Sequence, residues 1–150
     1  MDDIDRKILA ELQANGRLSL TDLGERIGLS LSPCHRRVRA LEEAGVIADY
    51  RANIDPMAVG LNFSAIVFVT LRSTDRAAVK AFEDAVPQVP EIIQAQRLFG
   101  DPDFMLHVIT TDLAAYQKLF DYSLSTLPSV QRLSSTLVMK HIVQNRPLPL

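Results

Sequence analysis

The sequence contains a single cysteine, Cys34, and no long hydrophobic run. One cysteine cannot form a disulfide within the chain, and this usage fits a reducing compartment. No stretch reaches the roughly 18 consecutive apolar residues that a membrane span needs. The acidic start Met1-Asp2-Asp3 is also unlike a secretory signal. We therefore expect a cytoplasmic protein without membrane contact.

Sequence patterns of common enzyme and metal sites are also missing. His35, His107, His141 and Cys34 do not have the spacing of metal ligands. The chain has no phosphate-binding glycine loop and no nucleophile elbow. His107 and His141 fall in expected strands, where a hydrogen-bonded structural role is the simpler interpretation, and Cys34 fits a small core position. The sequence predicts no catalytic site, no metal and no cofactor.

Positive charge is scarce as well, with 16 Lys and Arg against 18 Asp and Glu and a net charge of −2. Within residues 1–55 ten acidic residues accompany eight basic ones, although DNA-binding domains are usually basic. Residues 29–41, however, contain three arginines and no acid. This separation indicates a narrow cationic surface, which two copies of the chain would reinforce.

What is present is an ordinary globular composition, 47% apolar and 23% charged, in a chain long enough for two small domains. The apolar pattern of residues 3–15 predicts a first helix that serves as scaffold. Ser19 and Asp22 have the spacing of a capping box, and a short amphipathic helix follows until Gly28. The next helix is expected to begin with Ser32 as its cap and Pro33 in its first turn, and to stop at Gly45.

The helix that follows the turn at residues 28–31 has one apolar and one cationic side. Cys34, Val38 and Leu41 form the apolar stripe, so the polar residues between them point elsewhere. Two helices joined by a short glycine-containing turn form a helix-turn-helix, whose second helix enters the DNA major groove. Arginine suits that position because its fork pairs with guanine or with phosphate. The predicted DNA-binding residues are Ser30, Ser32, His35, Arg36, Arg37, Arg39 and Arg51.

Residues 46–54 are expected to form strands that make this a winged helix-turn-helix. Arg51, in that wing, is as consistent with a solvent-facing side chain as with a phosphate contact. Strands are then predicted at 63–71, 91–99, 104–110 and 130–144, with helices at 75–86 and 112–127. The order βαββαβ is that of a ferredoxin-like sandwich with both helices on one face. The fold class is therefore α+β, with domains at 1–55 and 62–150 and a linker at 56–61.

The sheet face without helices is predicted to be apolar. Ile66 and Phe68 alternate with the residues that face the helices, and the strand at 104–110 repeats the two-sided pattern. Exposed apolar sheet surface is unfavourable in water by about 25 cal/mol per Å². We expect another copy of the chain to cover this face, which gives an obligate dimer with two recognition helices. A monomer with differently placed strands is the alternative.

Several short runs of the sequence together form a family signature: residues 29–34 with Arg36, Arg37, Leu41, Glu42 and residues 45–47, then 53–56, 59–61, 100–104 and 128–146. These runs strongly resemble the Lrp/AsnC family of bacterial and archaeal regulators. This resemblance covers essentially the whole chain. It implies a transcriptional regulator whose dimers assemble further, often to octamers, and which responds to a free amino acid bound where residues 100–104 meet a neighbouring subunit.

The resemblance implies that the effector-binding residues are Gly100, Asp101, Asp103, Phe104, Ser134, Ser135 and Thr136. The family pattern in this loop is Gly-Asp-aromatic-Asp-Tyr, whereas this chain has Pro102 and Phe104. One backbone donor and one hydroxyl are therefore missing. Residue types alone favour a simple β-turn for this loop.

We expect an amino-acid-responsive, sequence-specific regulator that binds double-stranded DNA. Two alternatives remain at this point. An architectural DNA-binding protein would have no effector, and a small amino-acid-binding sensor or enzyme would need a catalytic pair that the sequence does not show.

Overall fold

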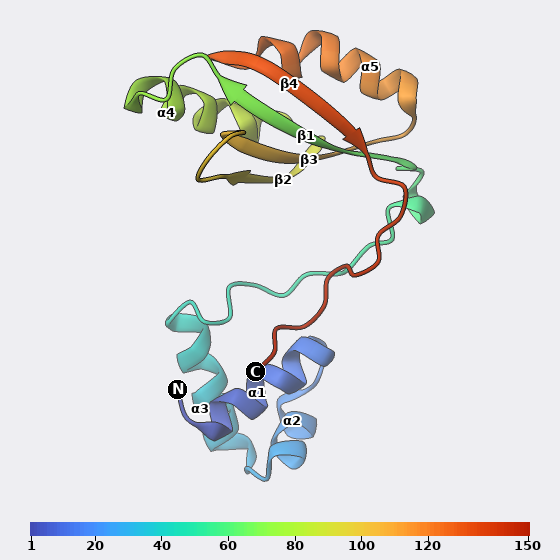
Figure 1. The fold of residues 1–150 in the computed structure, drawn as a ribbon. Coiled ribbons are helices and arrows are strands. Elements are labelled where there is room, and N and C mark those ends of the chain that lie inside the picture. The colour runs from blue at the N-terminus through green and yellow to red at the C-terminus, as the bar shows by residue number, and fades with distance from the viewer. The chain divides into compact units, whose positions relative to one another are not determined.

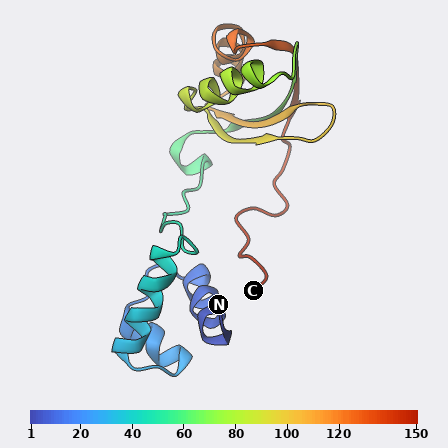
Figure 2. The same cartoon turned by 90° about the vertical axis from the view of Figure 1, so that its left-hand side faces the viewer.

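The computed structural model describes residues 1–150, and the chain forms two compact units. Unit 1 contains residues 1–53 and also 142–150, whereas unit 2 contains residues 54–141. The sequence predicts a division near residue 55 but assigns residues 142–150 to the second domain, and here the structure differs. Both units can be followed in Figure 1 and, turned by 90°, in Figure 2.

Unit 1 is built from α1 (Asp3–Ala14), α2 (Leu20–Ile27) and α3 (Leu31–Glu43). The Ser19 side chain caps α2 by accepting a hydrogen bond from the Asp22 N–H, and Gly28 ends the helix in the left-handed conformation. The predicted apolar stripes of the three helices meet in one core. Its buried members are Ile8, Leu9, Leu23, Ile27, Cys34, Val38 and Leu41.

The start of α3 differs from the prediction, whereas its end agrees. The helix begins at Leu31 with Ser30 in the cap position, so Ser32 is not the cap and Pro33 is the third helical residue. Proline is tolerated there because the first N–H groups of a helix have no intrahelical partner. At the other end Gly45 has a φ of 68°, and the Val46 N–H donates to the Leu41 carbonyl. This is a Schellman motif.

The strands predicted at residues 46–54 do not form, so that expectation is wrong. A strand needs a hydrogen-bonded neighbour, and residues 48–53 have no backbone partner in this structure. The apolar side chains of Val46 and Ile47, together with Tyr50, instead line a groove beside α1. The helix-turn-helix is present, but its wing is an extended segment.

Unit 2 has the predicted βαββαβ order. Its strands are β1 (Phe63–Leu71), β2 (Ile92–Arg97), β3 (Phe104–Thr110) and β4 (Val130–Leu137), and its helices are α4 (Arg76–Ala85) and α5 (Leu113–Tyr122). Unit 2 also contains three short 3-10 turns, at residues 57–59, 86–88 and 124–126. The sheet order is β2-β3-β1-β4, with every neighbouring pair antiparallel.

The two helices cover one face of the sheet (Figures 1 and 2). Beneath them Ala65, Val67, Val69 and Leu71 of β1 are buried, as the alternating pattern predicts. The intervening Ile66 and Phe68 lie on the opposite face and are only half-buried. We call the face that bears Ile66, Phe68, Met105 and His107 the open sheet face.

The last strand is shorter than predicted. β4 ends at Leu137, opposite Ala65, and the Val138 N–H makes the final bond to the Ser64 carbonyl. Its partner β1 begins at Phe63, so residues beyond 138 have no strand to pair with. Residues 139–144 are therefore not a strand, and the prediction for them, including His141, is wrong.

Candidate functional site

The exposed side of α3 presents the polar residues that the sequence singles out. Ser32, His35 and Arg36 are exposed, as is Ser30 directly before the helix. Ser32 and His35 border a shallow hollow of about 370 Å³ together with Leu20 and Leu31. Arg36 is the one arginine of α3 that forms no ion pair in this structure. Its guanidinium is therefore free to meet an anionic partner.

Arg37 lies differently from the expectation that it projects toward DNA. Its guanidinium is 2.8 Å from carboxylate oxygens of both Asp2 and Asp5, and it joins α3 to the start of α1. Asp2 and Asp5 also cap each other's backbone N–H groups at that helix end. The Asp5 N–H and then Arg37 lower the pKa of Asp2. Arg37 thus braces two helices, and binding to phosphate would require it to leave two carboxylates.

We expect the double substitution Asp2→Asn and Asp5→Asn to tighten DNA binding at low salt by severalfold. Asparagine keeps an oxygen that can cap the helix, while two negative charges next to α3 disappear and Arg37 is released. The measurement is a DNA titration at several salt concentrations. Asp84→Asn, which removes one charge in unit 2, is the control, and an unchanged affinity in the double variant would contradict the bracing role.

Arg39 and Arg51 form only exposed local pairs. Arg39 lies 2.8 Å from Glu43 one helical turn away, and Arg51, with 82% of its side chain exposed, lies 2.6 Å from Asp49. Pairs of this kind contribute about 0–1 kcal/mol, so both arginines can exchange their partners for phosphate. Nearby, burial and then a hydrogen bond to Glu42 raise the pKa of Tyr50 to about 12.

The loop between β2 and β3 is held by Asp103. Its carboxylate accepts a 2.7 Å hydrogen bond from the Leu71 N–H, its own N–H donates to the Val69 carbonyl, and its carbonyl accepts from the Leu98 N–H. The neighbouring Asp101 is exposed and accepts a 3.3 Å bond from the Thr70 hydroxyl. Asp103 therefore anchors the loop to β1, while Asp101 is the more available carboxylate.

We expect Asp103→Ala to lower the free energy of unfolding by about 1–3 kcal/mol, because a partly buried Leu71 N–H loses its acceptor. Asp103→Asn retains an oxygen at that position and should lose less. Urea denaturation followed by circular dichroism measures both. Equal stability of Asp103→Ala and the unsubstituted chain would contradict the anchoring role.

The remaining residues that the resemblance assigns to the effector do not gather in one place within the chain. Phe104 is 3% exposed and packs against Phe82 in the core, with ring centroids 4.6 Å apart and the rings tilted by 40°. Ser134 and Thr136 pair with Phe68 and Ile66 of the open sheet face. The intervening side chain is on the helix side, where the Ser135 hydroxyl lies 2.6 Å from the Tyr116 hydroxyl.

A hollow of about 480 Å³ lies on the helix side of the loop. Gly100 and Asp103 border it, as do Thr74, Arg97 and Phe99, which sequence reasoning missed. Arg97 and Phe99 directly precede the loop, so their position beside the glycine turn is the signal that could have identified them. Arg132 of β4 was missed too, although it lies 3.7 Å from Asp101.

Two further findings concern groups outside this loop. The His107 ring nitrogen lies 2.6 Å from the Ser64 hydroxyl, so the hydrogen bond predicted for this histidine is present. Burial and, secondarily, His141 lower the pKa of His107. No three His, Cys, Asp or Glu side chains lie together in a way that could hold a metal ion. None of the helices is long and apolar enough to span a membrane.

Comparison with known protein families identifies both parts of the chain. Residues 1–48 match a family model described as winged helix-turn-helix DNA-binding. Residues 64–148 match the model of the Lrp/AsnC ligand binding domain.

Similar proteins extend over nearly the whole chain. The proline dehydrogenase transcriptional activator of Rhodobacter capsulatus is 40% identical over 98% of this chain and 96% of its own length. The leucine-responsive regulatory protein of Rhizobium meliloti is 37% identical over 95% of this chain and 91% of its own. A transcriptional regulator of Neisseria meningitidis, solved as a complex with L-Met, superimposes with a TM-score of 0.93 at 36% identity, covering 99% of this chain and 96% of that one.

Proposed function

This chain belongs to the Lrp/AsnC family of transcriptional regulators, and from that premise we propose how its own residues act. Regulators of this family combine a DNA-binding helix-turn-helix with an amino-acid-responsive domain. We propose that α3 reads a DNA site, that the open sheet face joins two copies, and that the loop at residues 100–104 binds a free amino acid. Such a protein acts on DNA in the cytoplasm and needs no catalytic group.

The exposed side of α3 supports the DNA-binding proposal most directly. Arg36 is unpaired there, Ser32 and His35 lie near the helix N-terminus, and no acidic residue occurs between residues 29 and 41. In a helix-turn-helix the N-terminal residues of the second helix contact base edges. We therefore assign Arg36 as the principal contact, with Ser30, Ser32 and His35 beside it. Arg39 and Arg51 reach phosphate, and Arg37 contributes only when it leaves Asp2 and Asp5.

The open sheet face supports a dimer. Ile66 and Phe68 remain half-buried beside Met105 on the open sheet face. Both helices of unit 2 lie on the other face of the sheet (Figure 2). A second copy that places the same face against it would bury these side chains and bring two α3 helices to one DNA site. Each copy offers only a narrow cationic surface on α3, so the pairing of two copies strengthens DNA binding. Further assembly, to octamers, would join such dimers.

The loop at residues 100–104 supports an amino-acid site, and L-Met bound to the Neisseria relative indicates the chemical class. A free amino acid needs an acceptor for its ammonium and donors for its carboxylate. Asp101 is the exposed carboxylate for the ammonium, because Asp103 is already bonded to the Leu71 N–H. Arg97 borders the adjoining hollow and can hold the carboxylate. Ser134 and Thr136 would reach the site only from a neighbouring copy, as they point to the open sheet face.

The test begins with DNA fragments enriched from the genome of the host by the purified full-length protein. Their affinity is then measured with and without each of the twenty amino acids at fixed salt. We expect sequence-selective binding that at least one amino acid changes by about 5–150-fold, the usual range of allosteric coupling.

Three other outcomes would each overturn part of the proposal. Selective binding that no amino acid alters would identify an architectural DNA-binding protein and remove the effector site. Amino-acid binding without DNA binding would favour a metabolic sensor. Turnover of the amino acid would identify an enzyme.

A further inference from the structure

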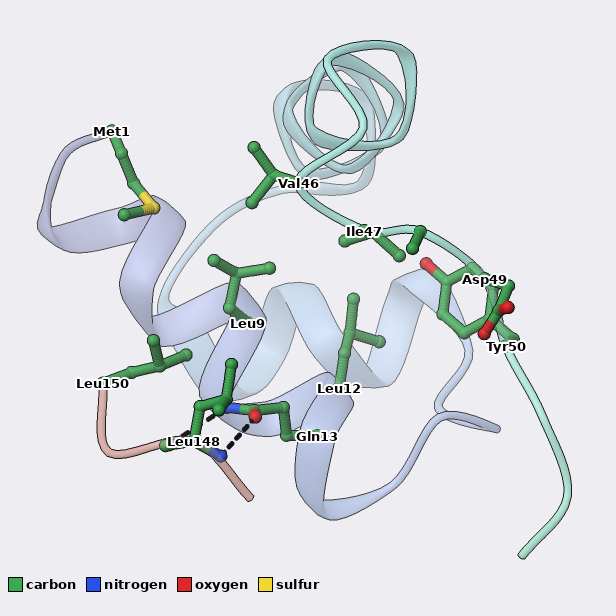
Figure 3. Close-up of a pocket in the computed structure, with 11 residues that line it drawn as sticks. Met1, Leu9, Leu12, Gln13, Val46, Ile47, Asp49, Tyr50, Leu148 and Leu150 are labelled. Carbon is green, nitrogen blue, oxygen red and sulfur yellow. Dashed lines mark hydrogen bonds between the residues drawn. The ribbon is translucent and has the colours of Figure 1, made fainter. Parts of the chain in front are cut away.

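A groove in unit 1 holds a segment of the same chain from far along the sequence. Leu148 and Leu150 border an apolar hollow of about 340 Å³. One wall is α1, with Leu9, Leu12 and Gln13, and the other is the segment at residues 46–50. Figure 3 shows Leu148 beside Gln13, with Leu9 and Leu12 projecting from the same helix. We call residues 145–150 the docking segment.

The Gln13 side-chain amide forms two hydrogen bonds with the backbone of the docking segment. Its amide oxygen accepts a 2.7 Å hydrogen bond from the Leu148 N–H, and its amide nitrogen donates a 3.4 Å bond to the Leu148 carbonyl (Figure 3). Pro147 and Pro149 flank Leu148, so its N–H is the only backbone donor in residues 147–149. Proline also restricts the preceding residue to extended conformations, which lowers the entropy lost on docking. Pairing with Gln13 therefore suits this segment.

A second contact ties the docking segment to the connection between the units. The Asn145 side-chain amide donates a 2.8 Å hydrogen bond to the Asn53 side-chain oxygen. The chain passes between the units at 53/54 and again at 141/142, so this bond joins both connections within unit 1. Residues 138–147 lead directly from the end of β4 to the groove. The groove contact of unit 1 and the end of β4 are thus linked by a short stretch of the same chain.

Both walls of the groove contact the recognition helix α3. The N–H groups of Val46 and Ile47 both donate to the Leu41 carbonyl in the last turn of α3, and Leu9 packs in the same core as Leu41. The docked side chains nevertheless remain accessible, with Leu148 70% and Leu150 47% exposed. A shallow apolar contact of this kind can open without unfolding the domain. The docking segment can therefore change between a docked and a released state while unit 1 stays folded.

We propose that the groove between α1 and residues 46–50 is a binding site for the Leu-Pro-Leu end of the docking segment of the same chain. Docking stabilises the helix-turn-helix, and through β4 it couples the effector domain to DNA binding. The coupling rests on the function proposed above, whereas the docking itself does not.

The first experiment detects docking in the full-length protein without DNA or effector. In methyl-labelled protein we expect nuclear Overhauser effects between the methyl groups of Leu148 or Leu150 and those of Leu9 or Leu12. Gln13→Ala removes both hydrogen bonds with a good helix former and should abolish these effects. Gln144→Ala, which makes the same change at an exposed residue outside the groove, should retain them. The proposal would be overturned if the methyl groups of Leu148 and Leu150 had random-coil chemical shifts that Gln13→Ala does not change. It would also be overturned if the Overhauser effects appeared only between differently labelled subunits.

The second experiment tests coupling by removing residues 147–150. We expect the variant to bind the amino acid normally, while the ratio of DNA affinities with and without it falls to within about twofold of one, from the 5–150-fold typical of allosteric coupling. A synthetic peptide of residues 145–150 should restore the melting temperature of the shortened protein, because a ligand of the folded state alone stabilises it.

An unchanged affinity ratio in the shortened protein would overturn the coupling, and a peptide without effect on its melting temperature would overturn the binding site. If the full-length protein shows no amino-acid response at all, the proposed effector function fails, and the outcome of the first experiment still decides whether the segment docks.

Discussion

A Phe68→Asp variant is expected to elute as a monomer, or to lose the fold of unit 2, at concentrations where we expect the unsubstituted chain to be dimeric. Phe68 lies in the middle of β1 on the open sheet face, opposite Met105 on β3 and Ser134 on β4. Burying a phenylalanine side chain contributes about 1.5–3 kcal/mol, and an unpaired carboxylate in its place costs several more. In a two-fold interface both copies lose this contribution, so the dissociation constant should rise by at least about 1,000-fold.

Light scattering coupled to size-exclusion chromatography measures the association, and circular dichroism reports whether the variant is folded. Gln117→Glu, which adds one negative charge to the exposed side of α5, is the control and should leave the dimer intact. Ile66→Ala, a milder change on the same face, should weaken association without unfolding. An unsubstituted chain that is monomeric at micromolar concentration would contradict the assignment of this face, and so would a Phe68→Asp variant that remains a folded dimer.

The second large effect is expected from Arg36→Ala, which should weaken binding to the selected DNA site by about 5–150-fold. This corresponds to about 1–3 kcal/mol, the range for one arginine paired with a base. Arg36 is exposed on α3 and, unlike Arg37 and Arg39, has no carboxylate partner to replace. Arg36→Ala should therefore lower the DNA affinity while leaving the free energy of unfolding of the free protein almost unchanged.

The type of contact follows from two further measurements. Arg36→Lys retains the charge but not the fork, so a base contact predicts a large loss and a phosphate contact a small one. A phosphate contact also predicts equal weakening on all sequences and a salt slope lower by about one unit. Arg76→Ala at the start of α4 removes the same charge from unit 2 as a control. If Arg36→Ala bound its site as tightly as Arg76→Ala does, α3 would not be the recognition helix.

Local patterns in the sequence determined most of the elements. The limits of β1 and β3 were predicted to the residue because each strand alternates between two environments, and a change in that alternation marks the end. The stop of α3 was equally local, since Gly45 alone can supply the left-handed conformation that closes a Schellman motif. The stripe of Cys34, Val38 and Leu41 predicted which side of α3 is buried. The helix-turn-helix and the βαββαβ order followed from such signals.

The tertiary structure alone decided features that depend on distant partners. β4 ends at Leu137 because β1 begins at Phe63, a limit that the apolar residues after 137 do not reveal. Residues 46–54 lack a strand partner, so their extended backbone stays unpaired, and residues 46–50 line the groove where Leu148 docks.

The same dependence governs the site residues. Arg37 braces α1 and Asp103 anchors β1 because Asp2 and the Leu71 N–H lie within hydrogen-bond distance only after folding. Residue type and spacing record what a side chain can do, namely pair with a carboxylate, a phosphate or an N–H group. Which of these partners it meets is set by contacts across more than 30 positions of sequence, such as the 35 between Asp2 and Arg37, and no local period carries that information.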